Sequence, residues 1–312
     1  MKMYKPHFWK KKNILTYIFL PISIIYSIFL TLLRLFSKEI KFNTKIICVG
    51  NIYLGGTGKT PLSIYIVNLY KKENKKTFLI KKFYKNQSDE VELIERSVQN
   101  SITLDRRLDS VKEAQKKGAE LIVMDDGFQD WSIKKDLSII CFDSNEGVGN
   151  EKVLPAGPLR EPLEKINKAQ IVVIKGGENK KLEELVHSKS RNVKIFYMNF
   201  FSEDINRLKG ENYLAFAGIG NPENFFDFLK KNGINVFQQL NFPDHYNYKK
   251  NDLDKILRIS KQKKLNILTT EKDYYRLPDS FKKHVEFIKI NVNIENKDLF
   301  KNEIDKYIKW NL

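Results

Sequence analysis

The chain has 312 residues, of which 42% are hydrophobic, and it carries a formal net charge of +17. This length accommodates two domains of ordinary size, and the hydrophobic fraction excludes a globally disordered protein. The positive charge suits a nucleic acid, an anionic membrane surface or a phosphorylated substrate, but no basic region interleaved with aromatic residues indicates a nucleic-acid partner. Cys48 and Cys141 lie in apolar, strand-like runs, which is typical of buried, reduced thiols in a cytosolic protein.

The N-terminus carries an uncharged apolar stretch over residues 14–33, long enough in principle to cross a bilayer, with basic residues on both flanks. No small-residue cleavage site follows it, so a removed signal peptide is not expected. On a helical projection its polar residues fall in one stripe, formed by Thr16, Ser23, Ser27, Thr31 and Arg34. A helix lying in the interface, with this stripe toward headgroups or toward the protein, fits as well as a span. We predict a membrane-associated helix over residues 1–36. Because both flanks are basic, whether residues 14–33 span the membrane or lie on its surface stays open.

The clearest chemical pattern follows at residues 46–60. An apolar, β-branched run breaks into a glycine-rich loop that ends in Gly58, Lys59 and Thr60, and a helix-like segment comes next. This layout is a phosphate-binding P-loop, in which backbone N–H groups and Lys59 bind phosphates and Thr60 offers its hydroxyl to Mg²⁺. Tyr53 stands where the usual pattern has its first glycine. The predicted nucleotide-binding residues are Tyr53, Leu54, Gly55, Gly56, Thr57, Gly58, Lys59 and Thr60.

Two acidic pairs follow apolar, strand-like runs further along the chain. Asp125 and Asp126 end the run over residues 121–124, which is the Walker B arrangement that holds Mg²⁺ directly or through water. Asp89 and Glu90 open a helix, where carboxylates also stabilise the first turn without any catalytic role.

Strands and helices alternate through the first two thirds of the chain, with further strands at 137–142 and 171–174 and a proline-rich loop between them. This alternation predicts an α/β fold with a mostly parallel sheet. A second, smaller α/β unit begins near residue 206, with strands at 213–217 and 236–240. The expected organisation is a helix over 1–36, a P-loop domain over 37–205 and a smaller C-terminal α/β domain over 206–312.

Taken together, the motifs resemble the tetraacyldisaccharide 4′-kinases, the lipid A 4′-kinases of Gram-negative bacteria. The resemblance covers nearly the whole chain and rests on residues 50–61, 89–90, 105–107, 125–129, 154–162, 217–222, 242–245 and 269–273. It implies transfer of the ATP γ-phosphate to the 4′-hydroxyl of an acylated disaccharide 1-phosphate, with ATP bound between the P-loop domain and the smaller domain. It also implies a location at the cytoplasmic face of the inner membrane. No obligate protein partner is evident.

The same resemblance implies roles for particular residues. Asp89 matches the family's proposed general base, His245 matches the residue thought to pair with it, and Lys59 completes the expected catalytic set. An isolated aspartate is a weak base, so a histidine that shares the proton would help, although His245 alone could equally be an ordinary loop histidine. The expected metal site is formed by Thr60, Asp125, Asp126 and Glu90. The candidate substrate-binding residues are Tyr84, Arg106, Arg107, Gln129 and Arg160, and ordinary salt bridges would explain the arginines equally well.

Two positions depart from the family pattern. Lys82 stands where the family has an arginine, and Asp130 where it has a histidine. Two other functions stay open beside the kinase: a P-loop switch or transport motor that hydrolyses ATP without an acceptor, and an ATPase that DNA or RNA stimulates.

Overall fold

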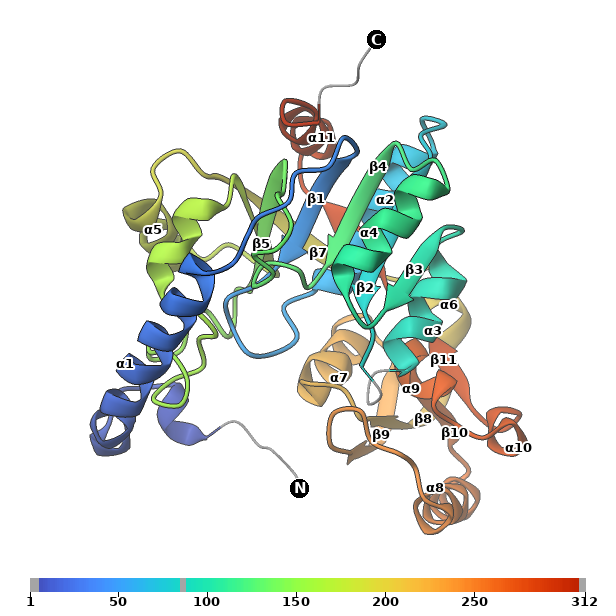
Figure 1. The fold of residues 1–312 in the computed structure, drawn as a ribbon. Helices are drawn as coiled ribbons and strands as arrows, with labels where there is room; N and C mark the ends of the chain where they lie inside the picture. The colour runs from blue at the N-terminus through green and yellow to red at the C-terminus, as the bar shows by residue number, and fades with distance from the viewer. Residues whose placement is uncertain (1–5, 85–87, 309–312) are drawn as a thin grey trace. The chain divides into compact units, whose positions relative to one another are not determined.

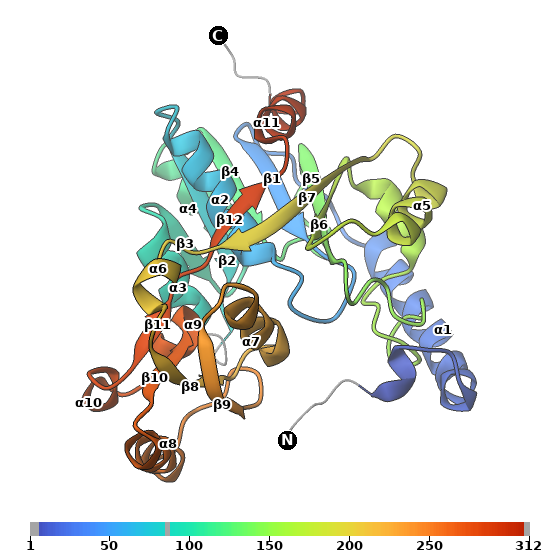
Figure 2. The same ribbon diagram turned by 180° about the vertical axis from the view of Figure 1, so that it is seen from behind.

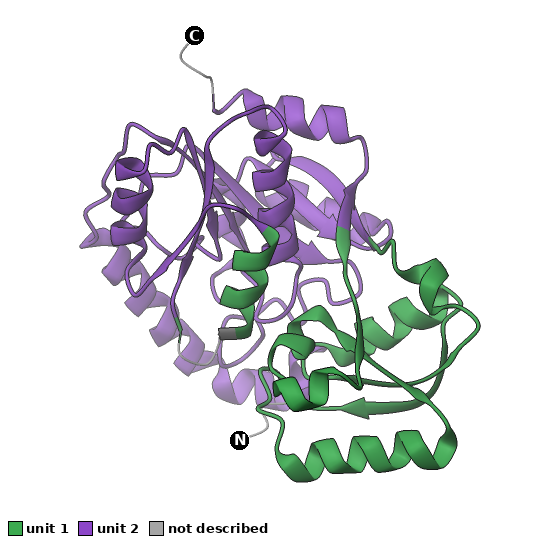
Figure 3. Ribbon diagram, turned by 90° about the vertical axis from the view of Figure 1, so that its right-hand side faces the viewer, with its two compact units in different colours: residues 1–3, 84–97, 201–291 green, residues 4–83, 98–200, 292–312 purple. Residues whose placement is uncertain are grey.

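The computed structural model describes residues 6–84 and 88–308, which form two compact units. Figure 3 colours them separately: residues 84–97 and 201–291 belong to a smaller unit, and residues 4–83, 98–200 and 292–312 belong to a P-loop unit. The expected boundaries at 37–205 and 206–312 therefore need correction at two places. The helix beginning at Ser88 joins the smaller unit because it packs against a helix there, and the last strand and helix join the P-loop unit.

The P-loop unit is built on an eight-stranded sheet with the order β12-β7-β6-β5-β1-β4-β2-β3. Its strands are β1 Lys45–Gly50, β2 Thr77–Lys82, β3 Ser101–Leu104, β4 Leu121–Asp125, β5 Leu137–Asp143, β6 Ile171–Lys175, β7 Lys194–Phe201 and β12 Asn291–Ile294. The neighbouring strands from β3 to β7 pair in parallel, as predicted. Figure 2 shows β12 beside β7, where the C-terminal part of the chain returns to this sheet.

Helices of the P-loop unit are α1 Ile14–Leu35, α2 Lys59–Lys71, α4 Arg107–Lys116, α5 Lys180–Lys189 and α11 Lys297–Asp305 (Figure 1). Short 3₁₀ helices lie at His7–Trp9 and Leu163–Lys168. Helix α2 packs on β1, β2 and β4, and α4 packs on β2 and β3. The central strand β1 lies between β4 and β5, so the carboxyl end of β1 is the point where a sheet of this type binds ligands.

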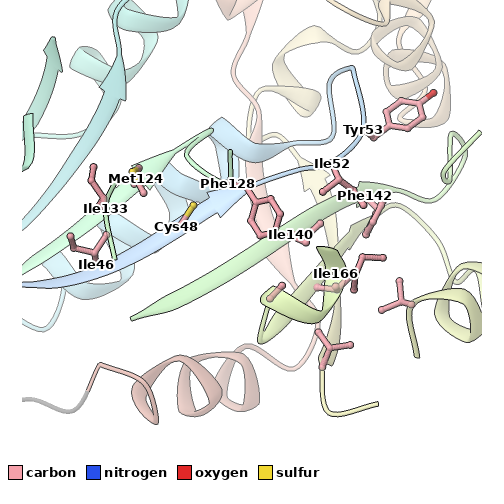
Figure 4. Close-up of a cluster of buried hydrophobic side chains, with 14 of the residues drawn as sticks. Ile46, Cys48, Ile52, Tyr53, Met124, Phe128, Ile133, Ile140, Phe142 and Ile166 are labelled. Carbon is pink, nitrogen blue, oxygen red and sulfur yellow. The ribbon is translucent and has the colours of Figure 1, made fainter. Parts of the chain in front are cut away.

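One apolar cluster in the core of this unit is drawn in Figure 4. Ile46 and Cys48 of β1, Met124 of β4 and Phe142 of β5 are all fully buried. Cys141 is also buried, and both cysteines are free thiols, as predicted. Burial of side chains along every central strand explains the unbroken apolar runs in the sequence, because each strand is covered on both faces.

The smaller unit has a four-stranded sheet with the order β11-β10-β8-β9, whose neighbouring strands run in parallel. Its strands are β8 Asn212–Ala217, β9 Asn235–Asn241, β10 Asn266–Thr270 and β11 Glu286–Ile288. Its helices are α3 Ser88–Ser97, α6 Ile205–Leu208, α7 Pro222–Lys231, α8 Lys250–Lys263, α9 Glu271–Tyr275 and α10 Asp279–Lys282. Helix α3 packs against α9, which brings a segment from early in the chain onto a late one.

Helix α1 turns its polar stripe toward its own unit. Thr16 and Ser23 are buried, and the Ser23 hydroxyl donates to the Val153 carbonyl (2.8 Å) and accepts from the Ala156 N–H (2.9 Å). The apolar faces of the helix are exposed, as illustrated by Ile25 at 67%. By length and composition, α1 is a helix that could cross a membrane. The stripe therefore faces the protein at Thr16 and Ser23, the second of the two arrangements expected for it, whereas Thr31 is exposed.

Candidate active site

The P-loop connects β1 to α2 in a tight conformation. Gly58, the N-cap of α2, has a φ of +86°, a value in the left-handed region that favours glycine. A Cβ there would lie 2.4 Å from the Met198 Cε. The Asn51 side chain closes the loop by donating to the Tyr53 carbonyl (2.6 Å) and the Thr57 hydroxyl (3.0 Å). The predicted loop thus exists, and Asn51, which we had not singled out, holds its shape.

Tyr53 contributes to this loop through its backbone. Its side chain is buried, and its hydroxyl donates to Glu146 over 2.7 Å. Burial and this hydrogen bond both raise the pKa of the phenol. A tyrosine in place of the usual first glycine is accommodated because its ring belongs to the core of the P-loop unit.

Asp125 is the most enclosed acid of the P-loop unit's site, with no exposed surface. Its carboxylate accepts from the Thr60 hydroxyl (2.8 Å), the Ser63 hydroxyl (3.0 Å) and the Lys81 ammonium (2.8 Å). Lys81 can reach it because β2 and β4 are neighbours that pair Ile80 with Met124. The structure therefore joins Asp125 to Thr60, as predicted, and adds Lys81 and Ser63.

Asp126 lies among cations. Lys59 is 3.7 Å from its carboxylate and Arg160 is 3.0 Å away. Burial opposes ionisation of this acid, but Lys59, Arg160 and Lys81 outweigh it and lower its pKa to about 2. The Arg107 guanidinium donates to the Asp126 carbonyl over 2.6 Å. Lys59 and Arg160 thus converge on one carboxylate at the end of the P-loop.

The donors at this end of the sheet suit Mg²⁺. A threonine hydroxyl and two carboxylates, from Thr60, Asp125 and Asp126, are hard oxygen ligands, and protein Mg²⁺ sites typically combine one or two carboxylates with phosphate oxygens and water. Among the described residues, the protein alone offers no group of three or more His, Cys, Asp or Glu side chains that could hold a metal. The donor set therefore fits a metal bound together with a nucleotide.

The predicted substrate-binding residues are placed unevenly. Arg107 is buried and lies 3.7 Å from Asp130, while the Gln129 amide donates to the Asn51 carbonyl over 2.8 Å. Together with Arg160 they surround the P-loop. Arg106 is not part of this group, because its side chain is 73% exposed and lies 3.9 Å from Asp109.

A second cluster lies in the smaller unit. The Asp89 carboxylate, 2% exposed, is 2.9 Å from the His245 Nδ1. His245 has a φ of +54°, and its backbone N–H donates to the Gly218 carbonyl over 3.1 Å. Burial would raise the pKa of Asp89, but His245, Lys272 and Arg276 outweigh it and keep the pKa below its usual value. The ionised Asp89 therefore accepts a hydrogen bond from a His245 ring protonated at Nδ1. The predicted pair is in contact.

Two cations complete this cluster, and sequence reasoning did not identify them. The Lys272 Nζ is 3.6 Å from Asp89 and 2.6 Å from Glu90, and the Arg276 Nε is 3.5 Å from Asp89. Lys272 lies inside the motif over residues 269–273, whereas Arg276 lies outside it, at the C-terminal end of α9. Glu90, which we expect at the metal, pairs with Lys272 over 2.6 Å in the smaller unit.

Tyr84 lies at the start of the smaller unit, and its side chain is 43% exposed. Lys82, which replaces a family arginine, ends β2 in the P-loop unit. Asp130, the other departure, accepts from the Ser132 hydroxyl over 2.6 Å and lies near Arg107. Asp130, at the position where the family has a histidine, thereby stabilises a loop.

Comparisons with known proteins agree with this geometry. The family model for tetraacyldisaccharide-1-P 4′-kinase matches residues 15–309. The tetraacyldisaccharide 4′-kinase of Pelagibacter ubique is 39% identical over 318 residues, covering 100% of this chain and 99% of that protein. The corresponding kinase of Rickettsia bellii is 34% identical, covering 98% and 99%.

A solved structure, LpxK from Aquifex aeolicus in complex with ATP, superimposes with a TM-score of 0.73 at 25% identity. It covers 95% of this chain and 100% of the other. Both the P-loop unit and the smaller unit contribute residues to these matches, which run almost from end to end. The chain belongs to the tetraacyldisaccharide-1-phosphate 4′-kinase family.

Proposed function

We propose that the protein transfers the γ-phosphate of ATP to the 4′-hydroxyl of a tetraacyldisaccharide 1-phosphate in lipid A biosynthesis. The observation that carries this proposal is the Asp89–His245 pair, 2.9 Å apart, in a chain that also has a complete P-loop with Lys59 and Thr60 at the start of α2. A P-loop alone suits any nucleotide hydrolase, whereas a carboxylate–histidine pair provides a place for the proton of an alcohol acceptor.

In the P-loop unit, backbone N–H groups of residues 53–60 bind the phosphates, and Lys59 neutralises the charge on the β- and γ-phosphates. Thr60, Asp125 and Asp126 would hold Mg²⁺, which would offset the negative charge of the phosphates. Lys59 and Arg160 contact Asp126, so both cations are already directed to the phosphate end of the site. Arg107 and Gln129 keep the strand-end loops in place.

In the smaller unit, Asp89 accepts the proton of the 4′-hydroxyl. As this proton leaves, the hydroxyl oxygen bonds to the γ-phosphorus, and the bond between the γ-phosphorus and the β-phosphate oxygen breaks. Its lowered pKa makes Asp89 a modest base, which suffices because phosphoryl transfer depends mainly on alignment and charge neutralisation. His245 orients the carboxylate through Nδ1. Tyr84 and Arg106, both exposed, are candidate contacts for the sugar or its 1-phosphate.

The acceptor is a lipid, and the exposed apolar faces of α1 support attachment to a membrane. Residues of this helix such as Ile14, Ile18, Ile25 and Phe29 are more than half exposed, an arrangement that water disfavours and a bilayer interface accepts. Since the P-loop has to meet ATP, we place the protein at the cytoplasmic face of the inner membrane.

Incubation with radiolabelled ATP, with and without the acylated disaccharide 1-phosphate, tests the proposal. We expect label in the lipid fraction only when the acceptor and Mg²⁺ are present. Release of labelled inorganic phosphate at the same rate without acceptor would instead indicate a motor or switch, and stimulation by DNA or RNA would indicate a nucleic-acid-dependent ATPase.

A further inference from the structure

Arg276 is the most densely bonded cation of the smaller unit's cluster. Its side chain is 6% exposed. The Nε lies 3.5 Å from the Asp89 carboxylate, the Nη2 donates to the Gly218 carbonyl (2.8 Å), and the Nη1 donates to the Tyr246 carbonyl (3.3 Å). The Nη2 also donates to the Asp273 carboxylate over 2.7 Å. One planar group therefore contacts four separate parts of the chain.

Two of these contacts hold the segment that carries His245. The Gly218 carbonyl accepts both from Arg276 and from the His245 backbone N–H (3.1 Å), and Tyr246 is the next residue in the chain. His245 is in the left-handed region with a φ of +54°, a conformation that is strained for a non-glycine residue. The loop therefore needs external bonds to keep the imidazole where it is.

Asp273 in turn fixes the guanidinium. This carboxylate is completely buried and accepts from the Gly218 N–H (3.0 Å), the Tyr248 hydroxyl (2.6 Å) and the Thr270 hydroxyl (2.6 Å). Thr270 ends β10, Gly218 follows β8, and Tyr248 lies in the loop between β9 and α8, so Asp273 ties the Arg276 guanidinium to three separate segments of the smaller unit.

Lys272 lies one helical turn before Arg276 and makes a different set of contacts. It supplies charge to Asp89 (3.6 Å) and to Glu90 (2.6 Å), both on α3. A lysine ammonium acts as a single charged point, whereas an arginine presents several donors in a fixed plane. Charge beside Asp89 is thus available from Lys272, but the connection between Asp89 and the His245 loop comes from Arg276.

We propose that Arg276 is a positioning residue for phosphoryl transfer. Its Nη atoms hold the His245 loop and its Nε faces the Asp89 carboxylate as an ion pair at 3.5 Å, so that Asp89 and His245 stay in hydrogen-bonding contact. This inference rests on the proposed function, because it takes Asp89 and His245 as the pair that receives the acceptor's proton.

The test is Arg276→Lys, which keeps the charge and loses the planar set of donors. We expect kcat to fall by roughly 10²-fold, the usual cost of an ångström-scale misplacement, while the KM for ATP stays unchanged because ATP binds to the P-loop unit. Arg258→Lys, an exposed position on α8, is the matched control and should retain wild-type kcat. Melting temperatures of both variants establish that they are compared in the folded state.

Two further measurements separate positioning from general stability. In a His245→Ala background, Arg276→Lys should cause little additional loss, because groups that act as one unit are non-additive. The NMR signals of the His245 ring should also shift in Arg276→Lys and not in Arg258→Lys. Fully additive losses, an unchanged His245 spectrum, or wild-type kcat in Arg276→Lys would each overturn the proposal.

Separate controls test whether the Arg276 variants fold and whether Asp89 is the base. If Arg276→Lys does not fold, Arg276→Gln takes its place, and failure of both to fold would make Arg276 purely structural and overturn the inference. An active Asp89→Asn variant would overturn the base assignment itself. An inactive Asp89→Asn beside an active Arg276→Lys would overturn only the inference about Arg276.

Discussion

Asp89 and His245 lie 156 positions apart in the chain, yet the Asp89 Oδ1 and the His245 Nδ1 are 2.9 Å apart. The contact is made because α3, early in the chain, belongs to the smaller unit with the later residues 201–291. An aspartate that the sequence would allow to be a simple first-turn residue is thereby one partner of a buried carboxylate–histidine pair.

Replacing Asp89 by Asn should lower kcat by roughly 10²–10⁴, the range expected for loss of a general base. The affinity for ATP should change little. The double variant with His245→Ala should lose little more than Asp89→Asn alone, because the two side chains act together. Steady-state kinetics check this, with Asp254→Asn on α8 as the control at an exposed acid. A near-normal kcat in Asp89→Asn would leave the base to another carboxylate.

The Lys59→Ala variant should be folded and nearly inactive. Lys59 provides the cation that faces the phosphates, and removing one preorganised charge-stabilising group costs about 10²–10³ in kcat. Its loss leaves Arg160 as the neighbour of Asp126, so the fold should persist. Transfer assays and thermal unfolding measure both properties, and Lys71→Ala, at the other end of α2, is the control. Wild-type turnover in Lys59→Ala would contradict the P-loop assignment.

Lys81→Met should destabilise the protein. The Lys81 ammonium and the Asp125 carboxylate form an ion pair of 2.8 Å, with side chains 4% and 0% exposed. Methionine fills similar volume but leaves the buried carboxylate without its cation, which typically costs 3–5 kcal/mol, so we expect a loss of about this size. Urea unfolding gives the value, and Lys112→Met, on the exposed side of α4, should change stability by less than about 0.5 kcal/mol. Equal stability of the two variants would mean that the Lys81–Asp125 ion pair contributes no net stability.

Glutamates placed on the exposed faces of α1 should release the protein from membranes. Ile25 and Phe29 are 67% and 55% exposed, and a charge at either position opposes transfer into the hydrocarbon region. Flotation with vesicles of anionic phospholipid should show binding of the wild type and loss of binding in the Ile25→Glu, Phe29→Glu double variant. Phe237→Glu, at an equally exposed aromatic on β9, is the control. Unchanged flotation of the double variant would move the membrane attachment elsewhere.

Glu161 should give the stability a measurable pH dependence. It is 2% exposed, and its Oε1 has no hydrogen-bond partner among the described residues. Burial raises its pKa, although Lys165, Arg34 and Lys135 act in the opposite direction. The folded state therefore prefers the neutral acid, so the contribution of Glu161 to stability is complete below the unfolded pKa and is lost as the pH rises through the folded pKa.

The Glu161→Gln variant should remove this dependence, since glutamine resembles the neutral acid. Its melting temperature relative to the wild type should rise between acidic and neutral pH. Glu184→Gln, an exposed position on α5, should follow the wild type across the same range. A difference between Glu161→Gln and the wild type that does not vary with pH would show that Glu161 does not titrate in the folded protein over this interval.

The P-loop could be predicted from the sequence because its chemistry is local. Residues 53–60 are contiguous, and the φ of +86° at Gly58 is a property of one residue and its neighbours. The parallel sheet could also be predicted, since strands covered on both faces leave continuous apolar runs such as residues 121–124. The polar stripe of α1 was visible for the same reason, as helical periodicity alone places Thr16 and Ser23 together.

Tertiary structure decided which distant residues meet. Nothing local distinguishes Arg276 from any other arginine, and its role follows from Asp89 and the Gly218 carbonyl, which lie far away in the chain. The contact between Lys81 and Asp125 also depends on tertiary structure, because it requires β2 and β4 to be neighbours. The unit boundaries likewise depend on the packing of α3 against α9. A short-range sequence pattern predicts the secondary structure that each segment can form alone. Long-range ion pairs and hydrogen bonds form only once the order of the strands in the sheet is established.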